Sequence, residues 1–199
     1  MKVLFFITCF IFLGLSAHAQ EWELKRSANN IKVYTRELDS TKINEYKAVL
    51  IANTSVENVV SIITNGNGLK NWNHKTPESE TLLKVSDKEY IFWMKNDLPW
   101  PITDRDHVCK VSVEKISPKN YKIDISPADT ILRLPEYNTI RIENFKGFWL
   151  INEIDENTVE ITQQMYGDPK GTIPSWLVNS ILTSFPFHSF ENLKEILEN

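Results

Sequence analysis

The sequence predicts an α+β fold in which a curved antiparallel sheet wraps around a long C-terminal helix. Between Thr81 and Tyr166, apolar or alternating segments follow one another with short, turn-like connections. Because a parallel strand pair needs a crossover of about a dozen residues or more, these connections favour antiparallel pairing. From Thr172 onward, apolar residues recur at helical intervals instead. A sheet with one such helix has one face to cover, and that helix is its expected cover.

The first third of the chain is predicted to contain strands and one helix. Trp22 to Lys25 is expected to form a helix or turn, and Ile31 to Thr35 a strand. Alternating apolar residues from Ile43 to Ala52 indicate a further strand. A helix is expected to begin at Thr54, which has capping-box spacing to an acidic residue, and to end at Asn65-Gly66.

Seven segments are expected to form the main sheet. They are Thr81 to Val85, Glu89 to Lys95, Arg105 to Val113, Tyr121 to Ser126, Asn138 to Glu143, Gly147 to Ile154 and Thr158 to Tyr166. The final helix is expected to start near Thr172 and Pro174. Pro186 cannot donate to the carbonyl of Leu182, so the helix is expected to kink or break there. A twisted sheet around one helix leaves a volume between them, and whether side chains fill it decides the function.

Residues 1–19 have the features of a secretory signal peptide. Lys2 provides a positive charge, an apolar run from Val3 to Leu15 follows, and Ala17-His18-Ala19 places small residues before a cleavage point at Gln20. The apolar run is shorter than the ~20 residues that a transmembrane helix needs. The sequence therefore predicts a leader over residues 1–19, one domain over residues 20–199, and export to the periplasm or the exterior.

The expected mature chain is acidic and contains one cysteine. Without Lys2 it holds 21 Lys and Arg residues against 26 Asp and Glu residues, a net charge of −5. The charges are scattered, which disfavours nucleic acid as a partner and electrostatic docking on anionic membranes. Any membrane contact is expected to be transient or mainly apolar. Cys109 has no partner for an internal disulfide and is expected to be a buried, unreactive thiol.

Three motifs are more specific than this overall pattern. Leu98-Pro99-Trp100-Pro101-Ile102-Thr103-Asp104-Arg105-Asp106 resembles the turn and strand start of START domains, the steroidogenic-acute-regulatory-related lipid-transfer family. Gly167 to Asn179 resembles that family's entry into its C-terminal helix, and Leu69 to Asn73 carries a similarly placed Trp. The resemblance implies a helix-grip fold with a tunnel beneath the C-terminal helix. It also implies that the tunnel holds one lipid, sterol or similar hydrophobic molecule.

Arg105 is the most informative polar residue of these motifs. In a strand it shares one face with His107 and Cys109, while Asp106 points to the other face; alternation does not say which face is inside. In START domains the matching Arg tends to point into the cavity, which the resemblance extends to Arg105. A buried guanidinium needs a partner. The candidate partners are Asp87, Glu89 or a polar ligand head group; the alternative is a rim salt bridge to Asp104 or Asp106.

Side chains on the expected roof helix are the preferred candidates for lining the cavity. With two residues of a neighbouring strand, the candidate ligand-binding residues besides Arg105 are Trp176, Val178, Ile181, Leu182, Phe185, Trp93 and Met94. Met165 is a further candidate wall. Any single aromatic residue is more often an ordinary core residue, so the group carries the prediction.

The sequence gives little support for catalysis. Asp104 and Asp106 point away from His107 in a strand, so the three do not form a metal site, and no metal or cofactor is expected. The leading hypothesis is an exported lipid-binding or lipid-carrying protein rather than an enzyme. A helix-grip cyclase or hydrolase is the alternative, and it requires Arg105, His107 and a carboxylate to converge on the cavity with perturbed pKa values. An interaction module with a filled core is a third possibility.

Overall fold

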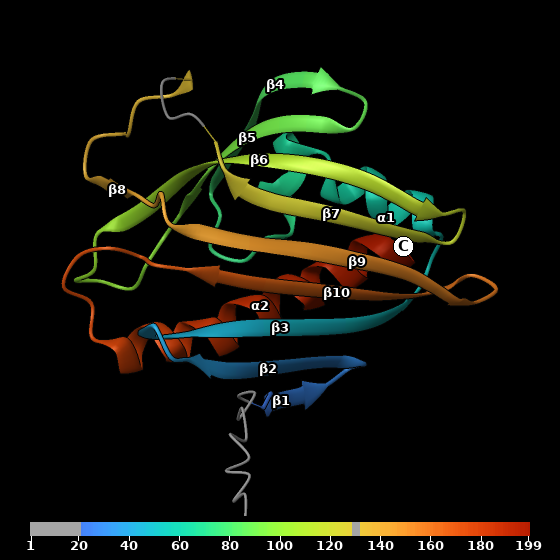
Figure 1. Cartoon of the computed structure of the whole chain (residues 1–199), viewed down its shortest axis with the longest axis horizontal. Helices are drawn as coiled ribbons and strands as arrows, with labels where there is room; N and C mark the ends of the chain where they lie inside the picture. The colour runs from blue at the N-terminus through green and yellow to red at the C-terminus, as the bar shows by residue number, and fades with distance from the viewer. Residues whose placement is uncertain (1–20, 129–131) are drawn as a thin grey trace, which may run out of the picture.

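The computed structural model describes residues 21–128 and 132–199, so the signal peptide expected over residues 1–19 lies outside the described residues. Ten strands form one sheet with the order β1-β2-β3-β10-β9-β7-β6-β5-β4, and β8 pairs with β6 beside this path (Figure 1). The strands are β1 Glu23–Ala28, β2 Ile31–Leu38, β3 Thr41–Asn53, β4 Glu78–Ser86, β5 Glu89–Asn96, β6 Asp104–Ser117, β7 Asn120–Pro127, β8 Thr139–Arg141, β9 Phe145–Asp155 and β10 Thr158–Gly167. The predicted α+β, helix-grip class is confirmed.

Hairpins account for most of the strand order. β4 to β7 form an antiparallel meander, and β9 pairs with both β7 and β10. The N-terminal strands then extend the sheet, because β3 pairs antiparallel with β10. One connection differs from the expectation: β8 pairs parallel with β6, in the register Arg105 to Ile140. The connection before β8 spans residues 128–138, so the short-loop argument for antiparallel pairing did not apply to it.

The expected opening helix or turn at Trp22–Lys25 is wrong, because this part of the chain enters strand β1. That strand pairs with β2 and is largely exposed, so it carries no alternating apolar pattern for sequence reasoning to detect. The N-cap of the first helix, α1 Val56–Ile63, is also one residue later than expected. Ser55 is its N-cap, and the Ser55 Oγ accepts a hydrogen bond from the Asn58 backbone N–H at 3.2 Å.

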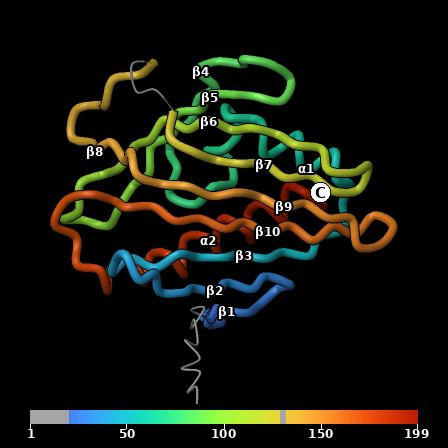
Figure 2. The backbone as a smooth tube through the Cα atoms, viewed as in Figure 1, coloured from blue at the N-terminus to red at the C-terminus, as the bar shows by residue number. Residues whose placement is uncertain are grey.

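The C-terminal helix α2, Ser175–Glu198, lies against one face of the sheet, behind β3 and β10 in the view of Figures 1 and 2. Pro186 lies inside it, so the helix is not interrupted there; of the two expected effects, a kink stays a prediction. The helix continues because its second half is anchored: Phe187, Phe190 and Leu193 are completely or almost completely buried. Each such side chain contributes roughly 1.5–3 kcal/mol of burial, which offsets the ~3 kcal/mol cost of an internal proline.

The core fills only part of the space between α2 and the sheet. Trp149 of β9 stacks in parallel on Phe190, with ring centroids 5.7 Å apart, and Trp72 meets Trp149 edge-on at 6.1 Å. Trp72 follows a short 3₁₀ helix, η1 Gly66–Asn71, that lies beside β4. These rings close the core under the second half of α2. The first half of the helix instead faces a cavity.

Candidate ligand-binding cavity

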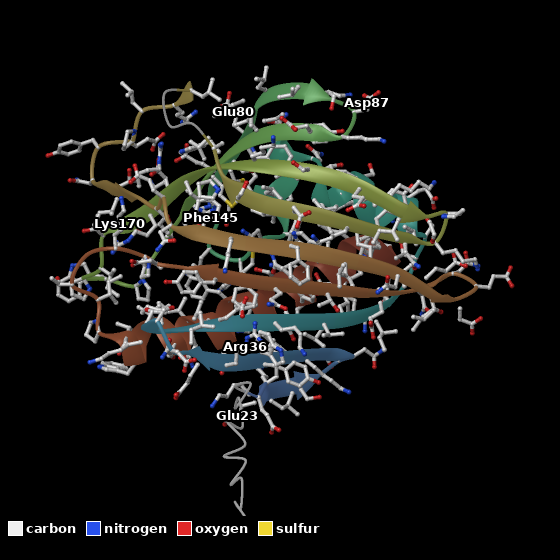
Figure 3. The ribbon with its side chains drawn as sticks, in the orientation of Figure 1. Glu23, Arg36, Glu80, Asp87, Phe145 and Lys170 are labelled. Atoms are coloured by element: carbon white, nitrogen blue, oxygen red, sulfur yellow. The ribbon has the colours of Figure 1, made fainter. Side chains whose placement is uncertain are left out.

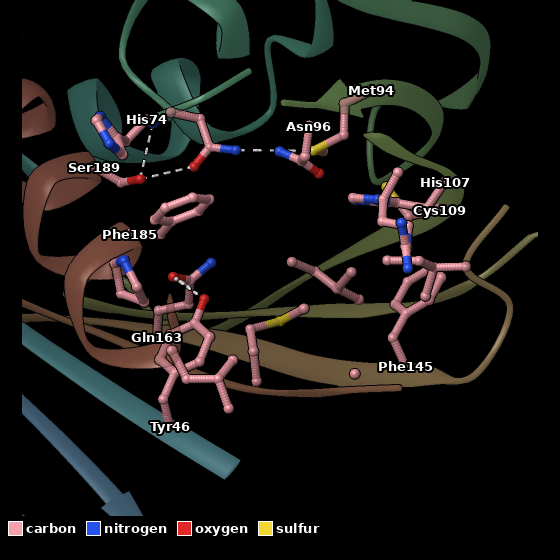
Figure 4. A pocket seen from close by; sticks show the side chains of 18 of the residues that line it. Tyr46, His74, Met94, Asn96, His107, Cys109, Phe145, Gln163, Phe185 and Ser189 are labelled. Atoms are coloured by element: carbon pink, nitrogen blue, oxygen red, sulfur yellow. Dashed lines mark hydrogen bonds between the residues drawn. The ribbon is translucent and has the colours of Figure 1, made fainter. Parts of the chain in front are cut away.

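A cavity of about 270 Å³ separates the first half of α2 from the sheet (Figure 4). Four of the helix residues expected to line it do so: Val178, Ile181, Leu182 and Phe185. They follow the spacing i, i+3, i+4 and i+7, which places them on one helical face. Met94 of β5 and Met165 of β10 contribute to the opposite wall, as expected. Contact of these six residues with a ligand stays a prediction.

Trp93 and Trp176 lie outside the cavity, so these two expectations are corrected. Phe92 and Met94 face the cavity, and strand alternation therefore turns Trp93 to the outer face of the sheet, where its Nε1–H donates to Asp106 at 2.9 Å. Trp176 is off the apolar face of α2 and 71% exposed. Residue type favoured both tryptophans for the cavity, but the period of the strand and of the helix determines where their side chains point.

Arg105 lines the cavity and is 3% exposed, as the resemblance implied. Its expected carboxylate partners are wrong. Asp87 lies at the β4–β5 turn, far from Lys170 at the other end of the sheet, and pairs with Lys84 at 2.6 Å (Figure 3). Glu89 pairs with Lys110 at 2.9 Å.

The guanidinium of Arg105 instead donates to three backbone carbonyls. Its Nε bonds the carbonyl of Pro169 at 2.6 Å, its Nη2 that of Lys170 at 3.0 Å, and its Nη1 that of Thr103. Burial lowers the pKa of Arg105, and the nearby Asp104 only partly opposes this. Arg105 therefore joins the turn before β6 to the connection between β10 and α2, which positions the start of the roof helix.

The Asp106 side chain lies on the face of β6 that points away from the cavity. Its carboxylate accepts hydrogen bonds from Arg141 Nε at 2.8 Å and Nη2 at 2.7 Å, and both side chains are almost completely buried. Burial raises the pKa of Asp106, but the hydrogen bonds from Arg141 and Trp93 outweigh it and hold its pKa below the usual value. Arg133 stacks over the Trp93 ring at 3.5 Å. This outer-face cluster holds β8 on β6 and excludes Asp106 from the cavity.

Polar side chains that sequence reasoning missed also line the cavity. The Tyr46 hydroxyl donates to Gln163 Oε1 at 2.9 Å, and the Ser189 hydroxyl donates to Asn73 Oδ1 at 3.0 Å (Figure 4). They come from β3, β10, α2 and the segment after η1, so no sequence motif links them. Strand alternation indicated that Tyr46 shares a face with Ala48 and Leu50, and this was the one available signal.

His107 faces the cavity beside Phe145, with ring centroids 5.3 Å apart. Burial lowers the pKa of His107 to about 4, and Arg141 adds to this while Asp106 opposes it. The imidazole is therefore neutral at neutral pH. Two buried ring nitrogens among the described residues have no hydrogen-bond partner, His107 Nδ1 and Trp72 Nε1, and both residues line the cavity. Buried polar atoms seldom lack a partner unless a ligand or water supplies one.

Among the residues that the structure describes, no group of three or more His, Cys, Asp or Glu side chains is arranged to hold a metal ion. Within residues 21–128 and 132–199, no helix combines the length and apolarity that crossing a membrane requires. Cys109 lines the cavity and is buried, and burial raises the pKa of its thiol to about 12.

The curved sheet, the roof helix and the apolar cavity between them define a helix-grip protein. The family model for the START domain matches residues 9–199, so the chain belongs to this family. A solved STAR-related lipid transfer protein from Xanthomonas axonopodis is 30% identical, with a TM-score of 0.80 over 88% of this chain and 98% of that one. An uncharacterised protein of Pseudomonas aeruginosa is 29% identical over 92% of this chain and 90% of its own length. Rat phosphatidylcholine transfer protein is 23% identical over 80% of this chain and 75% of its own.

Proposed function

We propose that this protein binds one hydrophobic molecule in the cavity beneath α2 and carries it without catalysing a reaction. The observation that supports this most directly is the 270 Å³ space that remains between the first half of α2 and the sheet. Most of its lining is apolar, and specific small-molecule sites are mostly apolar cavities with a few polar groups. The similarity to lipid transfer proteins supports the same proposal.

The test is to fill the cavity from the helix that roofs it. Ile181→Trp places a large ring in the cavity, whereas Ile196→Trp adds the same ring on the same helix at a position that is 40% exposed. Native mass spectrometry after incubation with a total lipid extract should show a one-ligand adduct for the wild type and for Ile196→Trp. Ile181→Trp should lose it. A bare protein mass under every lipid condition would overturn the proposal.

The geometry supports binding over the enzyme alternative. Arg105 and His107 do face the cavity together, but the carboxylate between them, Asp106, faces the opposite side and is paired with Arg141. No Asp or Glu is among the described residues that line the cavity. The carboxylate that the enzyme alternative requires beside Arg105 and His107 is therefore not among the described residues of the cavity wall. A cavity beside a packed core also argues against the third possibility, a filled interaction module.

We propose in addition that the end of the molecule near Arg105 makes transient, apolar contact with membranes. Trp100, Tyr137 and Trp176 are 92%, 94% and 71% exposed. Trp100 lies in the β5–β6 turn and Trp176 in the first turn of α2, and the hydrogen bonds of Arg105 join the flanks of these two segments. Tyr137 shortly precedes β8, whose first residue pairs with Asp104. Aromatic side chains favour the membrane–water interface.

Vesicle flotation tests this contact. The variant Trp100→Ala/Trp176→Ala should lower the bound fraction on neutral phosphatidylcholine vesicles, at low and at high salt, because the contact is apolar rather than electrostatic. Ile116→Ala/Ile154→Ala removes exposed apolar side chains from the hairpins at the opposite end and should leave binding unchanged. Equal binding by the two variants, or binding that high salt abolishes, would contradict the proposal.

Export is proposed on the sequence of residues 1–19 alone. The positive Lys2, the apolar run and the Ala-His-Ala segment support cleavage before Gln20 and release to the periplasm or the exterior. Expression of the full chain in a bacterium followed by intact-mass analysis of the periplasmic fraction tests this. The expected product starts at Gln20, and an uncleaved cytoplasmic product would overturn it.

A further inference from the structure

The cavity wall carries a buried positive charge without a counter-charge. Arg105 is 3% exposed and lines the cavity, and no carboxylate of the described residues lies within 4.0 Å of its guanidinium. Asp104 is the acidic residue that raises the pKa of Arg105. Its carboxylate accepts a hydrogen bond from the Leu98 backbone N–H at 3.1 Å and lies 3.7 Å from the Lys95 ammonium. A buried charge without a counter-charge is costly, so an anion bound beside Arg105 would stabilise it.

The hydrogen bonds of Arg105 leave room for that anion. A guanidinium has five N–H donors, and three of them go to the carbonyls of Thr103, Pro169 and Lys170. The other two find no acceptor among the described residues. Carbonyl groups disperse the charge but do not neutralise it. Two free N–H groups on a cation match the two oxygens of a carboxylate, the pairing for which the planar guanidinium is best suited.

The neighbourhood of Arg105 also favours a negative group. His107 lies two residues along the same strand face, about 7 Å away at the backbone, and its Nδ1 has no hydrogen-bond partner. The neutral imidazole offers one N–H donor. Gln163, Asn73 and Asn96 supply only uncharged amides. Arg105 is thus the one permanently charged side chain among the described residues that line the cavity.

We infer that the ligand is an amphipathic acid with a single alkyl chain, whose carboxylate pairs with Arg105 while the chain lies beneath α2. This inference rests on the proposed function. The cavity limits the size of the ligand, because its 270 Å³ lies just below the range of about 300–1,000 Å³ that is usual for small-molecule sites. A space of this size suits one alkyl chain better than two. Phe185 and Leu182 provide the apolar roof.

The state of the bound carboxyl group tests the pairing without any substitution. An apolar cavity alone raises the pKa of a carboxyl group, whereas an adjacent guanidinium lowers it. Dodecanoate labelled with ¹³C at the carboxyl carbon is bound to the full domain, and its ¹³C chemical shift is followed from pH 8 to pH 5. The shift should stay at its ionised value throughout. A shift that moves towards the protonated value above pH 5 would overturn the inference.

A pair of ligands and a pair of variants make the test specific. The wild type should bind dodecanoate about tenfold to a hundredfold more tightly than dodecanol, the worth of a charge-assisted hydrogen bond. Arg105→Met should abolish this preference while dodecanol still binds, which also shows that the variant is folded. Arg133→Met removes a cation from the outer face and should keep the preference.

The possible results distinguish a failure of this inference from a failure of the proposed function, the binding of one hydrophobic molecule. Equal binding of acid and alcohol, or tighter binding of phosphatidylglycerol than of dodecanoate, overturns the single-chain acid and leaves the cavity function standing. If Arg105→Met fails to fold, the wild type's preference for dodecanoate over dodecanol and the ¹³C titration of the bound carboxyl group still test the inference. If no acid, alcohol or phospholipid binds, the proposed function itself fails.

Discussion

Replacing Asp106 by Asn should destabilise the protein strongly while leaving the cavity intact. Asp106 accepts hydrogen bonds from Arg141 Nε and Nη2 and from Trp93 Nε1, at 2.7–2.9 Å, and its side chain is fully buried. Asparagine is nearly the same size, so packing is preserved. It carries no charge, and its amide nitrogen would face a donor of Arg141. The substitution therefore leaves a guanidinium buried without a counter-charge.

Removing one partner of such a pair costs about 3–5 kcal/mol. Because a domain of this kind is stable by about 5–15 kcal/mol, Asp106→Asn should consume a large share of the total. Urea unfolding followed by tryptophan fluorescence measures this. With a slope of about 1–3 kcal/mol per molar urea, the midpoint should fall by roughly 2 M. Ligand binding should survive below the unfolding transition, because Asp106 faces away from the cavity.

Two controls bracket the result. Asp106→Leu/Arg141→Met removes both charges, and it should be far less destabilising than Asp106→Asn because no charge remains unpaired. Lys84→Met breaks the exposed pair with Asp87 and should leave the midpoint unchanged. A loss of less than about 1 kcal/mol for Asp106→Asn at neutral pH would refute the assignment of a buried, mutually dependent pair.

Two other predictions concern residues that face the cavity. The pKa of His107 falls from 6.5 to about 4 on folding, so the folded state resists its protonation. The stability linked to His107 is complete above pH 6.5 and is lost, by up to ~3 kcal/mol, as the pH falls towards 4; His107→Gln should flatten the slope of unfolding free energy in that window. Cys109, with its pKa raised to about 12, should not react with a thiol reagent at pH 8 in the native protein, but should react fully in urea. Rapid native labelling would contradict its burial.

Local patterns were enough to predict most of the elements. Alternating apolar residues between turns predicted β5, β6, β9 and β10, because the period of two is a property of each strand alone. The predicted bounds lie within one or two residues of the observed ones, except that β6 extends further, to Ser117. The same reasoning missed β1, which has no buried face of its own. It predicted β8 as a strand within Asn138 to Glu143, but not its parallel pairing with β6, to which the hydrogen bonds between Arg141 and Asp106 contribute. A contact between residues far apart in the chain is not visible in the sequence on either side of them.

The candidate site was predicted in part for the same reason. Helical spacing selected Val178, Ile181, Leu182 and Phe185, and it would have rejected Trp176 had the period been applied to that residue. Strand alternation likewise separated Met94 from Trp93. Residue type alone, by contrast, misplaced both tryptophans, because large aromatic rings are as common in an outer cluster or on a surface as in a cavity.

The sequence by itself determined the antiparallel strands, the long final helix and the partition of β6 into one face with Arg105 and His107 and another with Asp106. These depend on backbone periods that each segment carries within itself. Only the tertiary structure decided which face is inside, how much space α2 leaves above it, and that Arg105 bonds to carbonyls rather than to a carboxylate. Every residue has a backbone carbonyl, so such a partner has no signature in residue type, and a cavity is the volume that packing fails to fill.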